Sequence, residues 1–507
     1  MNRIIPSILG LLLTSAPAWS QDHYDVARYS MLAPQGTARS IGFGGSLGSV
    51  GADFSSLSVN PAGIGLYRRG ELSFTPSIRF GAVTGNYLGS TTEDAYGNFN
   101  ISNLGLVTTT GGRRFDEASG GWKSVSFGFG LNRVADFNRS YSYVGRNSNS
   151  SFTEAFALSA NQDVADYGKL QENSFGNLGY QTYLIDQDSL GYYSTIRPVS
   201  GFSDVLGQRR TVSEKGGINE LLFSLGGNYE ERIMLGATIG VPILRYRRDA
   251  SFTENDASNT YTNFQDFTYT ETLKTTGVGV NMKFGVIVKP SSAFRFGAAI
   301  HTPTWYSLTD EQTNSVISNV TPEGRISFNL PQNEFSYQLR TPWRGVLSGT
   351  TFLGNWGFVS ADYEFVDYKS SRFTFETKEN QFAAGVGAFS EAQRIANDSV
   401  RANLQAASNF RLGGEAHIGG LFFRAGLGLY GSPYKNGNIM SGRTDLSAGF
   451  GFRGENGFID FGFVHTEYNS QENPYILNYG GSVGTIAPVA RLENNLNNLA
   501  ITVGTKF

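Results

Sequence analysis

The residues best suited to chemistry are few and lie far apart in the chain. The four histidines are His23, His301, His417 and His465, and the 507 residues include no cysteine. Without cysteine there are no disulfides, no thiolate metal sites and no cysteine nucleophile. A haem would need an axial ligand in an apolar pocket, and the scattered histidines do not indicate one, although haem binding stays open. We therefore expect no metal site and no cofactor.

Two further patterns resemble catalytic or nucleotide-binding motifs only superficially. Gly42-Phe43-Gly44, with Gly45 and Gly48, is glycine-rich like a dinucleotide loop, but the strand, helix and acidic residue of that fingerprint do not accompany it. The sequence also shows no recognisable nucleophile elbow for a Ser-His-Asp arrangement. We therefore predict that the protein is not an enzyme.

Composition favours an all-β membrane protein. Hydrophobic residues make up 40%, with 63 glycines, 38 phenylalanines and 25 tyrosines, and the mean hydropathy is -0.23. That is too polar for a bundle of membrane helices, whereas strands, tight turns and aromatic girdles suit a barrel. The formal net charge of -3 argues against nucleic acid as a partner.

Short two-faced runs recur along the chain. From residue 72 to 80, for example, apolar side chains alternate with Ser, Thr and Arg, which gives one face for lipid and one for a polar lumen. We predict a transmembrane antiparallel β-barrel of about fourteen strands with an N-terminal hatch (plug) in the lumen. The expected strands are 71–81, 101–110, 122–131, 219–229, 232–246, 276–288, 293–306, 335–353, 356–366, 408–418, 421–431, 445–453, 457–466 and 496–507.

The links between these strands alternate in length, as they do in outer-membrane barrels, which have short periplasmic turns and long outer loops. The short links are Glu230-Glu231, Lys289 to Ser292, Gly354-Asn355, Gly419-Gly420 and Gly454 to Gly457, and 111–121 is a longer periplasmic turn. The long links are 82–100, 132–218, 247–275, 307–334, 367–407, 432–444 and 467–495. This places both termini in the periplasm.

The two ends of the chain carry signals of their own. A positive start, a short apolar core and Ala18-Trp19-Ser20 predict a cleaved export signal over 1–20. Residues 21–70 are turn-rich and form the expected hatch, with one short helix before Pro34. The barrel then occupies 71–507, and its final Phe507 resembles the terminal signal recognised by barrel assembly machinery.

Five charged residues, Arg79, Lys283, Arg295, Glu415 and Arg424, alternate onto the expected lumen face. Pairing among them and contact with a ligand carboxylate are both open interpretations.

The sequence resembles a family at the glycine-rich run from Gly42 to Gly51, at Ser58-Val59-Asn60-Pro61-Ala62-Gly63, at 294–303 and at 360–365. It is similar to the outer-membrane transporters of Gram-negative bacteria for long-chain fatty acids and aromatic hydrocarbons, in a Bacteroidetes-type form. This resemblance implies a fourteen-stranded barrel closed by an N-terminal hatch. It also implies passive uptake of a hydrophobic small molecule, with release sideways into outer-membrane lipid through a gap in the wall. Pro242 and the glycines of the third strand are candidates for that gap.

Two residue sets follow from these considerations. Asn60, Pro61, Ala62 and Gly63 form the hatch motif, in which Asn bonds its own turn, Pro fixes φ and Ala permits close packing; they position the hatch or contact the ligand. The 132–218 link supplies the candidate ligand-capturing side chains Phe152, Phe156, Leu158, Tyr167 and Leu170. A loop without a ligand is an equal alternative.

The alternative function is a protein-binding shuttle, or an accessory subunit of a secretion or outer-membrane assembly system, with a protein partner at the outer loops. The long loops 132–218, 367–407 and 467–495 would be its docking surface.

Overall fold

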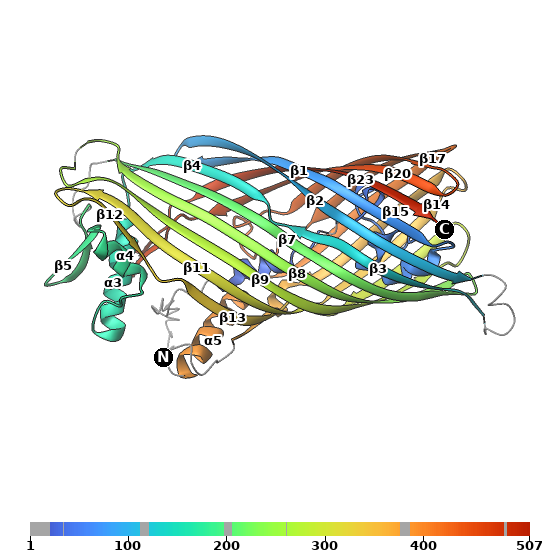
Figure 1. Cartoon of the computed structure of the whole chain (residues 1–507), viewed down its shortest axis with the longest axis horizontal. Helices are drawn as coiled ribbons and strands as arrows, with labels where there is room; N and C mark the ends of the chain where they lie inside the picture. Colours follow the sequence, from blue (N-terminus) through green and yellow to red (C-terminus); the bar gives the residue numbers. More distant parts are fainter. Residues whose placement is uncertain are drawn as a thin grey trace, which may run out of the picture.

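A computed structural model describes residues 21–33, 35–111, 121–196, 205–259, 261–375, 386–480 and 484–507, with the backbone alone for 386–389 and 480. Within these residues the chain forms a closed antiparallel barrel of fourteen strands (Figure 1). The seam joins β1 (Glu71–Tyr87) to β23 (Ala490–Lys506), which pair from Glu71–Lys506 to Tyr87–Ala490. The fold class predicted from the alternation is confirmed.

The strands follow one another around the wall in chain order, and some wall positions consist of two or three consecutive elements. Between the seam strands they are β2 (Ser90–Gly111), β3 (Trp122–Asp136) with β4 (Arg139–Asn147), β7 (Leu206–Tyr229), β8 (Ile233–Asp256), β9 (Phe264–Val288), β10 (Phe294–His301) with β11 (Trp305–Val320), β12 (Gly324–Asn329) with β13 (Asn333–Arg340) and β14 (Arg344–Phe352), β15 (Gly357–Asp367) with β16 (Arg372–Phe375), β17 (Ala406–Ile418), β18 (Leu421–Tyr430), β19 (Arg443–Arg453) and β20 (Gly457–Glu472).

Many strands extend well beyond the ranges predicted for them. β1 and β2 are joined by Leu88 and Gly89 alone, where a loop over 82–100 was expected. Likewise β8 continues to Asp256 and β11 to Val320. The reason lies on the outer face, where in β2 exposed Phe99 gives way to exposed Glu93. The strand continues, but its outer side chains are no longer apolar, so the alternation that indicates a membrane strand stops early.

Part of the outer face of the wall is an apolar belt, as β1 illustrates. Leu72, Phe74, Ile78 and Phe80 are 43% to 51% exposed, while Ser73 and Ser77 between them are buried on the inside. This inversion of the usual burial pattern is typical of a barrel whose outer face contacts lipid. Among the described residues, no helix is long and apolar enough to cross a bilayer.

The five links predicted to be short lie at one end of the barrel, here named the turn end. The opposite end, here named the loop end, carries the larger insertions and also the two-residue turn between β1 and β2 (Figure 1). The loop end carries α3 (Thr153–Tyr167), α4 (Phe175–Gln181), and the small hairpins β5 (Ile185–Asp188) with β6 (Gly191–Ser194) and β21 (Leu477–Gly480) with β22 (Gly484–Ile486). It also carries α5 (Val386–Asn403). The expected export signal 1–20, residues 112–120 of the expected periplasmic turn and Pro34 lie outside the described residues.

The described residues before β1 lie inside the barrel, and we call residues 21–70 the hatch segment. It contains α1 (His23–Ser30), α2 (Ala38–Gly42) and two 3-10 turns, η1 (Phe54–Ser58) and η2 (Pro61–Leu66). Asp22 begins α1 by accepting hydrogen bonds from the backbone N–H groups of Tyr24 and Asp25, at 2.7 and 3.3 Å.

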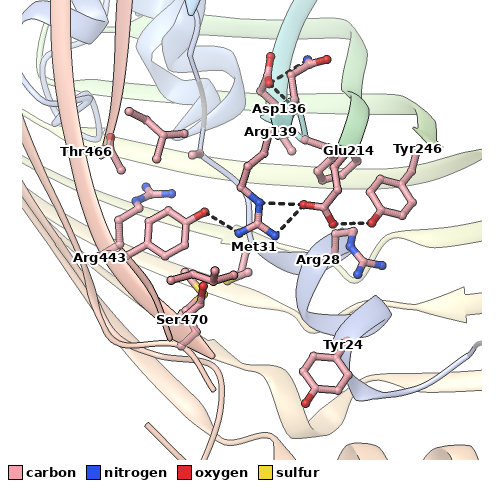
Figure 2. Close-up of a pocket in the computed structure, with 18 of the residues that line it drawn as sticks. Tyr24, Arg28, Met31, Asp136, Arg139, Glu214, Tyr246, Arg443, Thr466 and Ser470 are labelled. Carbon is pink, nitrogen blue, oxygen red and sulfur yellow. Dashed lines mark hydrogen bonds and ion pairs between the residues drawn. The ribbon is translucent and has the colours of Figure 1, made fainter. Parts of the chain in front are cut away.

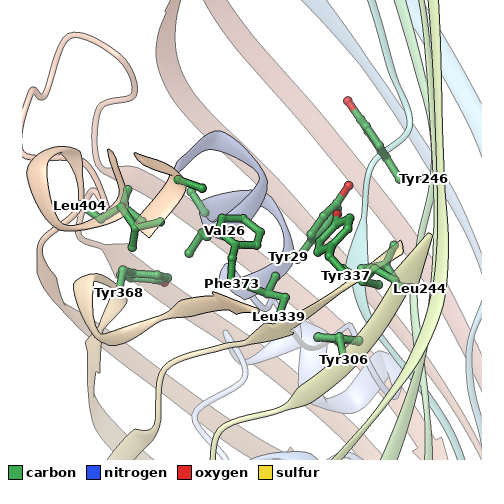
Figure 3. Packing of buried hydrophobic residues seen from close by; sticks show 14 of the residues in the cluster. Val26, Tyr29, Leu244, Tyr246, Tyr306, Tyr337, Leu339, Tyr368, Phe373 and Leu404 are labelled. Carbon is green, nitrogen blue, oxygen red and sulfur yellow. The ribbon is translucent and has the colours of Figure 1, made fainter. Parts of the chain in front are cut away.

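Helix α1 is held by the largest apolar cluster of the described residues. Val26 and Tyr29 pack against strand residues such as Tyr337 and Phe373 (Figure 3). Leu404, which directly follows α5, belongs to the same cluster. In addition, His23 Nδ1 lies 2.9 Å from Ser399 Oγ of α5. The start of the hatch segment is therefore fastened to an insertion at the loop end.

Candidate functional site: a lumenal cavity beside the hatch

The hatch motif binds the wall through Asn60. Its Nδ2 donates to the carbonyl oxygens of Gly48, at 2.6 Å, and of Val286 in β9, at 3.2 Å. Its Oδ1 accepts from the N–H of Ala62 at 3.1 Å, which caps η2 in front of Pro61. Asn60, Pro61, Ala62 and Gly63 are all buried, and none of them lines the cavity described below. The structure thus places these four hatch residues against the wall and outside the cavity lining.

Inward-facing glycines of the wall receive the hatch. A Cβ at Gly285 would overlap Asn60 Oδ1, and one at Gly236 would overlap the carbonyl group of Pro61. The backbone of the hatch approaches the strands where no side chain stands in the way. Other wall glycines where a Cβ would overlap hatch atoms, around Ala38, Phe43 and Phe54, are Gly105, Gly130, Gly413, Gly426 and Gly462.

Buried ion pairs add a second kind of attachment. Arg39 of α2 makes a two-pronged contact with Glu415 of β17, at 3.0 and 3.2 Å. Arg424 donates to the same carboxylate at 2.7 Å and pairs with Asp460 at 2.8 Å. Buried charges of this kind are tolerated when paired, and loss of one partner is strongly destabilising.

The five charged residues assigned to the lumen face from the sequence all have protein partners. Glu415 and Arg424 pair with each other, as one interpretation held. Lys283 lies 2.6 Å from Glu220, Arg295 donates to the Val50 carbonyl of the hatch, and Arg79 pairs with Asp136. Of these five, Arg79 alone lines the cavity.

A cavity of about 630 Å³ lies between the hatch segment and the wall. Its lining comes from α1 and α2, from β4, β7, β8 and β9, and from β18, β19, β20 and β23. A volume of this size is typical of small-molecule sites. The lining is unusual for a purely apolar ligand, because it includes seven arginines and seven carboxylates.

One end of the lining is organised around Arg139 (Figure 2). Arg139 Nε donates to Glu214 at 2.8 Å, and Tyr246 OH donates to the other oxygen of that carboxylate at 2.7 Å. Arg28 of α1 pairs with Asp25 and lies with its guanidinium carbon 4.4 Å from the centre of the Tyr246 ring. The hatch segment and the wall thus share one polar network.

A second group of charges forms a closed square. Arg210 lies 3.0 Å from both Glu271 and Glu472, and Arg248 contacts the same two carboxylates, Glu472 at 3.0 Å. Two positive and two negative groups therefore come from β7, β8, β9 and β20. Sequence reasoning assigned these residues to loops, because the alternation of apolar and polar residues stops before them.

The ladder of hydrogen bonds in the wall is incomplete beside this cavity. β2 and β3 pair from Gly111–Ser124 to Asn103–Asn132, after which β2 residues 90–102 pair only with β1 among the described strands. β3 ends at Asp136, and β4 resumes two residues later by pairing with β7. The break therefore lies in the third wall strand, after Asp136. The glycines predicted for it, Gly128 and Gly130, lie earlier in that strand, where β3 is still paired with β2. At the other candidate, Pro242, the pairing of β8 with β9 skips two residues.

Side chains and the hatch segment cover the break. Asp94 of β2 accepts from the N–H and the hydroxyl of Ser142 in β4, at 2.6 and 2.7 Å. On the inside, the N–H groups of Ala33 and Gln35 donate to the carbonyls of Val134 and Arg133, at 2.8 and 3.1 Å. The cavity lining includes Ala33, Gln35 and residues 135–138, so the cavity reaches the break.

The predicted capturing side chains are placed mainly inside the loop end. Phe152 and Phe156 are buried in an aromatic cluster with Phe252, Phe267 and Tyr269. Leu158 and Leu170 pack against this cluster, whereas Tyr167 is 54% exposed. Phe152 and Phe156 therefore lie in the core of this insertion, and the capture of a ligand by the five side chains stays a prediction.

The histidines are separate, as their spacing indicates. His301 is buried and lies 2.8 Å from the carbonyl oxygen of Val59, so it contacts the hatch. His465 contacts Asn497 and Glu467. Among the described residues, no group of three or more His, Asp or Glu is arranged to hold a metal ion.

Comparisons with known proteins agree with this architecture. No protein-family model and no curated protein matches the sequence. Among solved structures, a FadL homologue from Pseudomonas aeruginosa is similar with a TM-score of 0.53 and 12% identity, over 94% of this chain and 100% of that chain. The fold is FadL-like.

Two monoaromatic transporters are also similar. A deltaS2 mutant of the TodX monoaromatic hydrocarbon channel has a TM-score of 0.53 and 11% identity, over 93% of this chain and 98% of that one. The toluene transporter TbuX of Ralstonia pickettii is 14% identical over 93% of this chain and 98% of that chain, with a TM-score of 0.48.

Proposed function

We propose that this protein is an outer-membrane transporter of a Gram-negative bacterium that takes up hydrophobic or amphipathic small molecules passively. The observation that carries the proposal is a cavity that extends from the lumen to a break in the wall. The apolar outer belt supports a membrane location, and the FadL-like fold is consistent with it. In this orientation the loop end faces outward and the turn end faces the periplasm.

The physical reason for such a route is the energetics of the solute. Moving an apolar molecule from water into protein or lipid releases about 25 cal/mol per Å² of buried surface, so no energy input is required. The obstacle is the polar outer layer of the membrane. A route from the cavity through the break in the wall delivers the solute to the bilayer while the part of the hatch that Asn60 and Arg39 attach to the wall stays in place.

The decisive experiment compares two disulfide staples, which is straightforward because the chain has no cysteine. Asp94→Cys with Ser142→Cys joins β2 to β4 across the break, where the two side chains are 2.7 Å apart. Thr109→Cys with Ser126→Cys is the matched control, since these side chains lie 2.9 Å apart where the same wall ladder is intact. Uptake of labelled fatty acid, monoaromatic and neutral amphiphile is measured in a host lacking other such transporters.

We expect the oxidised staple across the break to reduce uptake strongly and a reductant to restore it. The control staple should leave uptake unchanged. If the unmodified protein raises uptake of no member of the panel, the transport function is refuted. If the variant with the oxidised staple across the break takes up the panel as well as the unmodified protein does, the lateral route is refuted while transport stands.

A second candidate function is supported by the loop end. Tyr167, Tyr180, Tyr183 and Leu190 are exposed on the insertion between β4 and β7, and Leu190 is 95% exposed. Exposed apolar side chains on a small folded insertion favour a docking surface for a protein partner. Deletion of residues 153–194 should abolish retention of that partner and leave uptake in place if both activities exist.

A further inference from the structure

The cavity beside the hatch is lined by charges that balance. We propose that its ligand is an amphiphile without net charge, with a head group rich in hydrogen-bond donors and acceptors, and that fatty-acid anions and plain hydrocarbons are disfavoured. This inference rests on the proposed function, since it names the class of molecule that the cavity would hold during uptake.

Every arginine of the lining already has a carboxylate partner. The pairs described above account for Arg28, Arg79, Arg139, Arg210 and Arg248. Arg443 pairs with Asp445 at 3.1 Å, and Arg411 pairs with Glu364 at 3.3 Å just outside the lining. The seventh carboxylate, Asp22, accepts backbone hydrogen bonds at the start of α1. The charge of each arginine of the lining is therefore already balanced by a carboxylate.

An anionic ligand would meet carboxylates that are already bound to the arginines. A carboxylate that enters the cavity must either displace Glu271 or Glu472 from the arginines or remain beside them as a third negative group. Both alternatives leave a charge unpaired in a partly desolvated space, which is unfavourable. A cation would have to displace an arginine or remain beside the arginines as a third positive group, because each carboxylate of the square is held by two arginines.

A ligand with no polar atoms would cover polar groups of the lining. The lining presents the side chains of Tyr430, Tyr468, Asn473 and Asn497 in addition to the ion pairs. Covering these groups with hydrocarbon would remove their water without replacing its hydrogen bonds. An uncharged or zwitterionic head group replaces those bonds and leaves the ion pairs intact, because it offers donors to carboxylates and acceptors to arginines in equal measure.

The cavity also provides for the apolar part of such a molecule. Ile41 and Val59 of the hatch segment, and Val464, Leu492 and Leu496 of the wall, belong to the same lining. Ile41 packs with Val464. The ligand is thus expected to place its head among the charges and its chain along these residues.

The test uses the full chain in lipid nanodiscs and a series of probes that share an n-dodecyl chain. Laurate is the anion, dodecyltrimethylammonium the cation, dodecylphosphocholine the zwitterion, dodecyl glucoside the neutral head and dodecane the hydrocarbon. Affinities are measured by calorimetry below the critical micelle concentration, at pH 7.5 and low salt. We expect the neutral or zwitterionic probe to bind about tenfold or more tightly than laurate and dodecane.

Charge variants of the square make the test independent of the absolute affinities. Glu472→Gln leaves Arg210 and Arg248 with one carboxylate between them, so laurate affinity should rise about tenfold relative to dodecyl glucoside. Glu472→Asp, which keeps the charge, should restore the selectivity. Glu467→Gln is the matched control on the same strand, because this side chain is 63% exposed and lies outside the lining.

Arg443→Gln supplies a second, opposite change, which covers the case in which Glu472→Gln does not fold. It releases Asp445 and should raise the affinity for dodecyltrimethylammonium. Preference for laurate or dodecane in the unmodified protein overturns the inference and leaves transport in place, and so does unchanged selectivity in both charge variants. Failure of all five probes to bind overturns the inference together with the transport function.

Discussion

The attachment of the hatch can be tested at a single side chain. Asn60→Ala removes three hydrogen bonds, to the carbonyls of Gly48 and Val286 and from the N–H of Ala62, with lengths of 2.6, 3.2 and 3.1 Å. The side chain is fully buried, so water does not replace the lost partners. Each net hydrogen bond contributes about 0.5–1.5 kcal/mol, and buried groups left without partners add to the loss. We estimate a loss of about 2–4 kcal/mol in the free energy of hatch docking.

Hydrogen–deuterium exchange of residues 36–66 in nanodiscs measures this docking directly. A loss of that size corresponds to about 30- to 1,000-fold faster exchange of the protected amides, because 1.4 kcal/mol is a factor of ten. Exchange of the seam amides of β1 and β23 should be unchanged, since the wall does not depend on this contact. Exchange in the hatch within threefold of that of the unmodified protein would refute the assigned role of Asn60.

Gly285→Ala provides a coupled control. Its methyl group would overlap the Asn60 side chain, whereas the nearest atom of another hatch residue, Pro61 Cδ, is 3.1 Å away. Gly285→Ala should therefore destabilise docking in the unmodified chain and cost much less when combined with Asn60→Ala. Simple additivity of the two changes would show that the side chains do not meet in this way.

Two further outcomes follow from the geometry. A disulfide between Ser49→Cys and Thr350→Cys, whose hydroxyls are 2.7 Å apart, fixes the hatch to β14 and should leave uptake unchanged if release is lateral; a large drop would show that the hatch moves. Burial lowers the pKa of His23, so its contact with Ser399 is stable with a neutral ring and weakens as the pH falls below about 6.5. Exchange of α1 at pH 7.5 and 5.5 measures this, and His23→Gln should lose that pH dependence.

The part of the fold that faces lipid could be predicted from the sequence, because alternation of apolar and polar residues is set by the strand itself. Where the strands rise beyond the apolar belt, as at Glu93 in β2, both faces are polar and the pattern disappears. The extra strand length was therefore missed. The same physical limit hid Glu271 and Glu472, which lie in these extensions.

The cavity could not be predicted, because it depends on register between strands that are distant in sequence. Arg139 meets Glu214 through the pairing of β4 with β7, and Arg210 meets Glu472 across the lumen. A single sequence indicates which residues point into the lumen, but not which of them lie at the same height along the barrel axis. The placement of Phe152 and Phe156 could not be predicted for a related reason: they fill the core of an insertion, and a single sequence does not distinguish apolar core residues from an apolar binding surface.

The contacts of α2 have a consequence for the order of assembly. The N–H of Ala38 donates to Thr502 of β23 at 2.7 Å, and Gly462 of β20 leaves room for the same residue. β23 completes the barrel by pairing with β1, and Ala38 and Thr502 are 464 residues apart in the chain. The full set of wall contacts of α2 therefore exists only when the seam is closed, so closure of the seam and docking of α2 stabilise each other.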